Sequence, residues 1–425
     1  MKSVIPQSFD SYLARWQRFA KDHEDACVAI FLVFFTVIFS YPLIWNMGEI
    51  LTGSPGEPTD LDVFDFRIFL DSIHHMRALW LAGKPILSGV VTHTFSPSLS
   101  YTFLGVALTF FMPTIVAHNV MMLVAIFLAG FFMFKLAKRF SSDSLACLYA
   151  AINFASCRYI LIHLLQGHPN QVQIFWLPLI FLILEITLQE GPRLREAFWL
   201  GLSFGLLLLS NDHFSVYMIL ILPFYTLLRL PRNFKIKQYL PYLLTFLLVL
   251  GVVAGYVSYF RLKAEGYHYS LADNMYFSMH LGDILAYNKE SNLGIFPLTL
   301  SLLGLLFALM KREKPMLVLA ALAFTATLLA LGPFHPWAPY RALFDFVPLF
   351  DRMRTPIRMV VFLLLAASCM SAYGFAWLRN YVAASSTRYL SLVITLVLFG
   401  LTLRYNHFRA QLFAHKLVFS SSSTP

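Results

Sequence analysis

The chain contains repeated apolar blocks, most of them about as long as a lipid bilayer's hydrocarbon core is thick. That core measures about 30 Å, and roughly 20 apolar residues cross it as a helix, which satisfies its own backbone hydrogen bonds. We therefore expect an all-α polytopic membrane protein with about eleven transmembrane helices, within a range of ten to thirteen. The predicted spans are 26–45, 114–134, 144–162, 172–188, 197–210, 214–228, 239–260, 293–310, 315–332, 359–378 and 389–403.

The composition supports a membrane protein and argues against a soluble one. Hydrophobic residues make up 58% of the 425 residues and charged residues 13%, whereas soluble domains average about 25% charged residues. The net charge of +10 comes from short Lys and Arg clusters between the apolar blocks. Such clusters set orientation and contact lipid headgroups, so we do not expect nucleic acid as a partner.

Alternate loops carry the denser positive charge, and this pattern predicts the orientation. The cytoplasmic side is defined by the clusters at 135–139, 193–195, 229–237, 311–314 and 379–388. We expect residues 1–25 to lie on the same side as an interfacial helix. A single membrane domain then covers 26–404, with a first outer loop at 46–113 and a C-terminal tail at 405–425. Within that loop, residues 99–112 are too short for a comfortable span, so we expect a helix at the outer interface.

The first outer loop holds six of the chain's 22 acidic residues, including Asp60, Asp62 and Asp65. One interpretation is helix N-capping and dipole pairing by Asp60 and Asp62. The other is a carboxylate that acts as a general base or a metal ligand. Near lipid a carboxylate loses hydration, and its pKa rises toward neutral pH.

Three further outer segments carry polar side chains of interest. His163, His168 and Asn170 lie in a short loop, where a structural turn and a phosphate or sugar site are both open. Asp212 and His213 lie between two predicted apolar helices. A carboxylate there is expected to face a polar cavity or a basic partner. Arginine binds phosphate in bidentate fashion, so a run of three arginines before a long apolar helix favours a lipid-borne phosphate over ordinary headgroup contact. The run consists of Arg352, Arg354 and Arg358.

The order of these features resembles that of GT-C membrane glycosyltransferases and, more narrowly, of bacterial YfhO-like membrane proteins. The shared order is an anchor helix, an acidic outer loop, an interfacial helix after Pro97 and a span that ends in Lys and Arg. A loop with Gly167, His168 and Asn170 follows, and then a late arginine run around Pro356. The resemblance covers most of the chain, and it rests on the order of the features, since each motif alone is weak.

The resemblance implies sugar transfer from a polyprenyl-phosphate donor to an acceptor hydroxyl, at the outer face of a bacterial inner membrane. Asp60, Asp62 or Asp65 would be the base in a direct inverting displacement. The donor phosphate would lie against Arg354 and Arg358, with Lys84 nearby. The acceptor would be a glycan, a lipid or a protein. A divalent cation is possible, although His168 and Asn170 stand where the oligosaccharyltransferase has acidic metal ligands.

Other functions compete with this one. A transporter or lipid flippase would use buried polar groups such as Arg158, Glu185 and Asp212 along a path, and inverted repeats, which we do not find, would favour it. A polysaccharide polymerase or ligase would concentrate its chemistry in a large late outer loop. A non-catalytic subunit of envelope polysaccharide assembly is the third alternative.

Overall fold

The computed structural model describes residues 22–41, 43–48, 77–78, 81–82, 99–166, 168–231, 234–261, 268–286, 288–348, 350–385, 397–398 and 400. These residues form helices joined by turns and loops, with no β-strand among them. The α-helices are α2 (Glu24–Phe39), α5 (Leu99–Thr109), α6 (Thr114–Ala137), α7 (Ser144–Ala155), α8 (Arg158–Leu165), α9 (Pro169–Val172), α10 (Trp176–Glu190), α11 (Leu194–Ser210), α12 (Asp212–Arg229), α13 (Ile236–Arg261), α14 (Leu271–Tyr276), α15 (Ile295–Lys311), α16 (Lys314–Ala330), α17 (Pro339–Phe346) and α18 (Val360–Ser385). Four short 3₁₀ helices accompany them: η1 (Leu43–Asn46), η2 (Leu281–Ile284), η3 (Phe350–Arg352) and η4 (Pro356–Met359).

Five helical segments of the described chain are long and apolar enough to cross a membrane. They are Thr114–Ala137, Ser144–Leu165, Pro169–Glu190, Ile236–Val253 and Pro356–Val382. Three shorter apolar helices join them: His213–Arg229, Ile295–Lys311 and Lys314–Ala330. The protein is therefore an all-α protein with the helices of a membrane protein.

The structure departs from two predicted spans near one end of the bundle. The predicted helix 144–162 breaks between α7 and α8, where the Ser156 hydroxyl donates a hydrogen bond to the Ile152 carbonyl. The Ser156 N–H keeps its helical bond to the same carbonyl, and Cys157 then adopts an extended backbone that separates the two helices. The predicted helix 172–188 corresponds to α10, which begins at Trp176 after the short α9 has ended at Val172. Both places bring polar side chains into the bundle.

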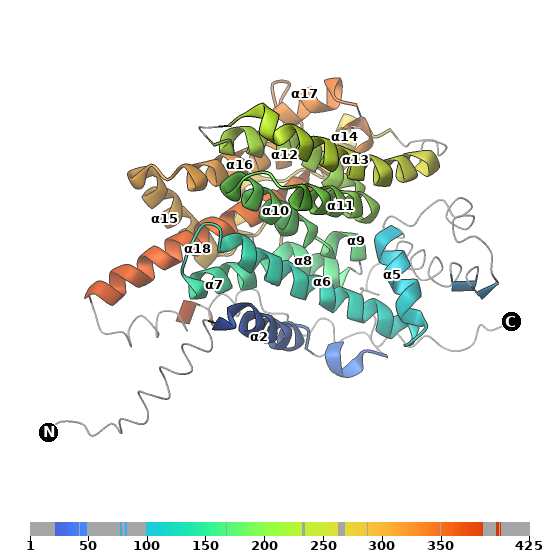
Figure 1. The fold of residues 1–425 in the computed structure, drawn as a ribbon, viewed down its shortest axis with the longest axis horizontal. Helices are drawn as coiled ribbons and strands as arrows, with labels where there is room; N and C mark the ends of the chain where they lie inside the picture. Colours follow the sequence, from blue (N-terminus) through green and yellow to red (C-terminus); the bar gives the residue numbers. More distant parts are fainter. Residues whose placement is uncertain are drawn as a thin grey trace.

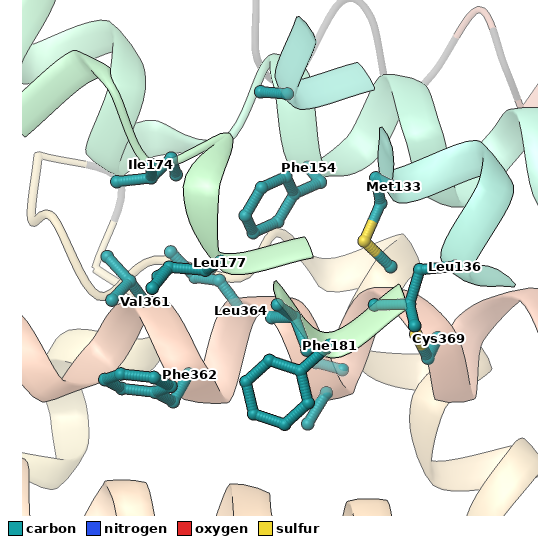
Figure 2. Close-up of a cluster of buried hydrophobic side chains, with 14 of the residues drawn as sticks. Met133, Leu136, Phe154, Ile174, Leu177, Phe181, Val361, Phe362, Leu364 and Cys369 are labelled. Atoms are coloured by element: carbon teal, nitrogen blue, oxygen red, sulfur yellow. The ribbon is translucent and has the colours of Figure 1, made fainter. Parts of the chain in front are cut away.

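Helix α18 forms the centre of the bundle. It packs against α7, α15 and α16, with further contacts to α6 and α10, and it crosses the fold between α7 and α15 (Figure 1). Almost its whole length is buried, while α13 is mostly exposed and packs chiefly on α11. Figure 2 shows the core where α6, α7, α10 and α18 meet, with Met133, Phe154, Phe181, Val361 and Leu364 in one apolar cluster.

Two helix pairs approach closely because glycines line their contacts. A Cβ atom added at Gly304 of α15 would lie 2.3 Å from the Met370 carbonyl oxygen of α18. A Cβ at Gly374 of α18 would lie 2.1 Å from the Leu300 carbonyl oxygen. Small residues let helix backbones approach in a membrane, where packing and hydrogen bonds drive association. Gly201 and Gly205 of α11 approach α13 in the same way.

Polar contacts join the loops into two groups, one at each end of the bundle. At one end, Lys135 pairs with Asp25, Lys138 with Glu24, Arg139 with Glu190 and Arg379 with Asp143. At the other end, hydrogen bonds and ion pairs connect the α8–α9 loop, the start of α12, the segment 268–294 and the segment 335–358. The basic side chains of the first group, Lys135, Lys138, Arg139 and Arg379, belong to clusters that the sequence pattern assigns to one side.

Candidate functional site

The loop between α8 and α9 brings two histidines together. Helix α8 ends at Leu165, and the backbone N–H of His168 donates to the His163 carbonyl, which folds the loop back on the helix. Pro169 then begins α9, where its missing N–H costs nothing. As a result the two Nδ1 atoms of His163 and His168 lie 3.1 Å apart. The His163 side chain is buried and that of His168 is half-buried.

Glu290, from the loop before α15, lies against this pair. Its Oε2 atom is 3.5 Å from Nε2 of His163, the distance of a charge contact rather than of a well-formed hydrogen bond. Burial raises the pKa of the Glu290 carboxyl, but His163, Arg358 and His168 lower it more, so the pKa lies below its usual range. Glu290 is therefore ionised at neutral pH.

Tyr159 and Gln171 also belong to this cluster. The Tyr159 hydroxyl donates to Oε1 of Gln171 at 2.6 Å, and the rings of Tyr159 and His163 are 4.4 Å apart, edge to face. This hydrogen bond joins α8 to α9 across the loop between them. Both side chains are buried.

The first residues of α12 and the residue before them also contact this region. Asn211 caps the helix by accepting a hydrogen bond from the Phe214 N–H, and its Nδ2 donates to the Asn170 carbonyl at 3.0 Å. His213 follows in the first turn. One turn further, the Tyr217 hydroxyl donates to the Thr355 carbonyl at 3.0 Å.

The arginine run supplies the positive charge. The guanidinium of Arg354 lies over two aromatic rings, 5.1 Å from the Phe277 centroid and 5.7 Å from that of Tyr269, as in a cation–π contact. Arg358 belongs to η4, which begins at Pro356. Its charge acts on five side chains of this region: Tyr159, His163, His213, Tyr217 and Glu290. Arg354 also acts on His213.

Several buried polar atoms of this region have no hydrogen-bond partner among the described residues. They are Nε2 of Gln171, Nε2 of His213, Oγ of Ser291 and Oγ1 of Thr355, while Nε2 of His163 has the 3.5 Å charge contact with Glu290 in place of a hydrogen bond. An unpaired buried polar group costs roughly 1–3 kcal/mol, so these atoms indicate a region that receives a ligand or water. His213 among them is within the electrostatic range of both Arg354 and Arg358, which suits an anion.

The structure brings together five of the residues that the sequence analysis selected. His168, Asn170, His213, Arg354 and Arg358 all belong to this cluster, although Asn170 contributes through its carbonyl. Arg352 is instead exposed. Asp60, Asp62, Asp65 and Lys84 lie outside the described residues, as does the side chain of Asp212.

The sequence analysis did not select Tyr159, Tyr217, Glu290 and Thr355 as site residues, and it considered His163 only as a possible donor in its loop. The tyrosines and Thr355 carry no sequence signal, because they resemble ordinary residues of apolar helices and turns. Glu290 did carry a sequence signal, because it is an acidic residue in a predicted outer loop. A cluster of two arginines and three histidines needs such a counter-charge. Only the fold shows that it faces His163.

Among the described residues, no group of three or more His, Cys, Asp and Glu side chains is arranged to hold a metal ion. The chain matches no protein-family model and no curated protein. What the protein does must therefore be argued from the site.

Proposed function

We propose that the protein transfers a sugar from a polyprenyl-phosphate donor to an acceptor hydroxyl at the extracytoplasmic face of a bacterial inner membrane, with a GT-C-like arrangement of about eleven spans. The observation that carries the proposal is the cluster of Arg354, Arg358 and His213 beside buried donors without partners. A phosphate on a lipid carrier fits such a site, because guanidinium groups bind it strongly where water is scarce.

The position of the cluster supports a donor that enters from the membrane. Arg354 and Arg358 stand directly before the long apolar helix α18, and His213 begins the apolar helix α12. A polyprenyl tail would lie along these apolar surfaces while its phosphate meets the guanidinium groups. In the transition state these groups would stabilise the charge that develops on the departing phosphate.

The acidic loop supplies the base in this proposal. Asp60, Asp62 or Asp65 would take the proton of the acceptor hydroxyl as its oxygen attacks the anomeric carbon. The new bond forms as the bond to the phosphate oxygen breaks, so the anomeric configuration inverts. The proposed orientation puts residues 1–25 in the cytoplasm and this loop outside.

The proposal is tested by sugar transfer with purified protein in liposomes, from a synthetic polyprenyl-phosphate sugar to a mixture of hydroxyl acceptors. We expect Arg358→Gln to lower kcat/KM on the order of 100-fold, the effect of removing a buried transition-state donor. Arg352→Gln is the matched control, since Arg352 is exposed in the same run. We expect it to stay within about twofold of wild type.

Substitution of each acid separates the roles of the three aspartates. One of Asp60→Asn, Asp62→Asn and Asp65→Asn should abolish most of the transfer while donor binding is retained. Full activity in all three variants would refute the base assignment. Movement of the lipid-linked sugar across the bilayer without transfer would instead identify a flippase.

A further inference from the structure

The carbonyl of Thr355 links the backbones of the two arginines of the site. It follows Arg354 directly, and it accepts the Arg358 N–H at 3.2 Å, the bond that begins η4. It also accepts the hydroxyl of Tyr217 of α12 at 3.0 Å. A carbonyl oxygen has two lone pairs, so both are used. The Tyr217 hydroxyl therefore holds the peptide unit on which the placement of both arginines depends.

Tyr217 is fully buried, and its hydroxyl carries a cost that a phenylalanine would avoid. A buried hydroxyl destabilises a protein unless it forms a hydrogen bond. A phenylalanine ring would fill the same space in the apolar helix α12, including the contact with Phe350, whose centroid is 6.1 Å from that of Tyr217. What the hydroxyl adds is the bond to the Thr355 carbonyl. That bond distinguishes Tyr217 from an ordinary aromatic residue of the core.

The segment 269–277 holds the arginine run through main-chain bonds. The N–H of Tyr269 donates to the Asp351 carbonyl at 2.8 Å, and the N–H of Ile357 donates to the Phe277 carbonyl at 3.2 Å. The same segment supplies the two rings under the Arg354 guanidinium. The run therefore has a fixed backbone on this side, and the Tyr217 hydroxyl fixes it from α12.

Tyr217 also connects the arginine run to the histidine of α12. His213 stands one turn before it, and the two rings are 6.5 Å apart, edge to face. Tyr340 of α17 contacts the run as well, 3.2 Å from the Met353 carbonyl, but its single hydroxyl hydrogen faces a nearer acceptor, Oδ1 of Asn274, at 2.9 Å. Tyr217 is thus the side chain that ties α12 to the run.

We infer that Tyr217 is a positioning residue, whose hydroxyl holds Arg354, Arg358 and His213 in the one arrangement that binds the phosphate of a polyprenyl-phosphate donor. This inference rests on the proposed function and deepens it. Guanidinium groups bind phosphate through directed hydrogen bonds, and preorganised donors need no rearrangement when charge develops. Loss of the hydroxyl should therefore weaken the contact with the phosphate and leave the contact with the apolar tail unchanged.

The test compares Tyr217→Phe with Tyr225→Phe in the full-length protein in nanodiscs. Both substitutions keep the ring and remove one fully buried hydroxyl of α12, and that of Tyr225 donates to Glu185 at 2.7 Å, nearer the other end of the helix. Binding is measured with a fluorescent polyprenyl phosphate and with the matching polyprenol, which lacks the phosphate. The reactivity of Arg354 toward hydroxyphenylglyoxal, read by mass spectrometry relative to the exposed Arg352, reports on the run without any ligand.

We expect Tyr217→Phe to raise the Kd of polyprenyl phosphate about tenfold, the scale of one well-formed hydrogen bond, and to leave the Kd of polyprenol within about twofold of wild type. The reactivity of Arg354 relative to Arg352 should rise severalfold. Tyr225→Phe should change neither reading. It loses a bond to a buried carboxylate, so its melting temperature should fall at least as far as that of Tyr217→Phe.

The outcomes separate this inference from the proposed function. A wild type that prefers the phosphate probe, together with an unchanged Kd in Tyr217→Phe, would overturn the inference and leave the proposed function standing. An equal loss in Tyr225→Phe, or an equal loss for polyprenol, would also overturn it, because the hydroxyl would then act through general stability or through the lipid tail. A wild type without preference for the phosphate would reject the proposed function, and the reactivity of Arg354 would then decide alone whether Tyr217 holds the run.

Discussion

Glu185 is a fully buried carboxylate on α10, and four hydrogen bonds hold it. Arg229 of α12 donates to both of its oxygens, the Tyr225 hydroxyl donates at 2.7 Å and Gln189 donates at 2.8 Å. A buried charge is tolerated where it is paired in this way. Glu185 therefore joins α10 to α12, and Arg229 balances its charge.

We expect Glu185→Gln to lower the free energy of unfolding by about 3–5 kcal/mol, because it leaves Arg229 buried without a counter-charge. Thermal unfolding in detergent measures the loss. Asp345→Asn is the control, since Asp345 pairs with Arg341 at an exposed site and should cost about 0.5 kcal/mol or less. Equal effects of the two substitutions would contradict the argument.

Glu290 gives the folded state a pH dependence of known sign. Its pKa in the folded protein lies below the ordinary value of 4.5. The ionised form is thus favoured on folding, and this contribution to stability is fully present above about pH 4.5. It is lost as the pH falls through the lower, folded-state pKa.

We therefore expect wild type to exceed Glu290→Gln in melting temperature at pH 6, and the difference to shrink below pH 4.5. Melting curves in detergent between pH 3 and pH 7 measure it. A difference that grows as the pH falls would reverse the sign and refute the assignment.

The sequence predicted some residues of the site from their type and position. It could not predict which residues contact them. Histidine at 168 and 213 and arginine at 354 and 358 stand out at the ends of apolar blocks, so they were selected from sequence. Glu290 and His163 meet because the loop before α15 folds over α8. No local pattern encodes a contact between segments so far apart in the chain.

At the scale of the element, the positions of helices could be predicted from hydrophobicity. The positions where a helix breaks could not. The predicted helix 114–134 corresponds to α6, and the predicted pair around Asn211 corresponds to two separate helices, α11 and α12. The break after Ser156 escaped prediction because apolar residues continue through it, so hydrophobicity gives no sign of the extended backbone at Cys157.

The glycine crossing of α15 and α18 yields a prediction at this scale. Gly304→Ala places a methyl group against the Met370 carbonyl, so the helices must separate, and we expect a loss of about 1–3 kcal/mol. Gly251→Ala on α13 is the matched control, because nothing lies within 4 Å of the added carbon. It should be neutral or stabilising, as alanine favours helix. Equal melting temperatures for the two variants would contradict the close crossing.

At the scale of the whole molecule, the two polar ends define a testable orientation. Single cysteines, in a background whose four native cysteines are replaced by serine, should react differently with a membrane-impermeant maleimide. Ser54→Cys and Lys289→Cys should react in intact cells, and Ser142→Cys only after the membrane is opened, because the charge pattern places position 142 inside. Reaction at 142 in intact cells would reverse the orientation.

The burial of α18 has a consequence for how the protein is made. This helix follows α2 to α17 in the chain, yet it is the one that most of the bundle surrounds. During synthesis the earlier helices enter the bilayer with their inner faces turned toward lipid or the insertion machinery, since their final neighbour does not yet exist. Tertiary assembly thus waits for translation to pass residue 385, and nascent chains that stop before residue 360 should be open to proteases that the finished protein resists.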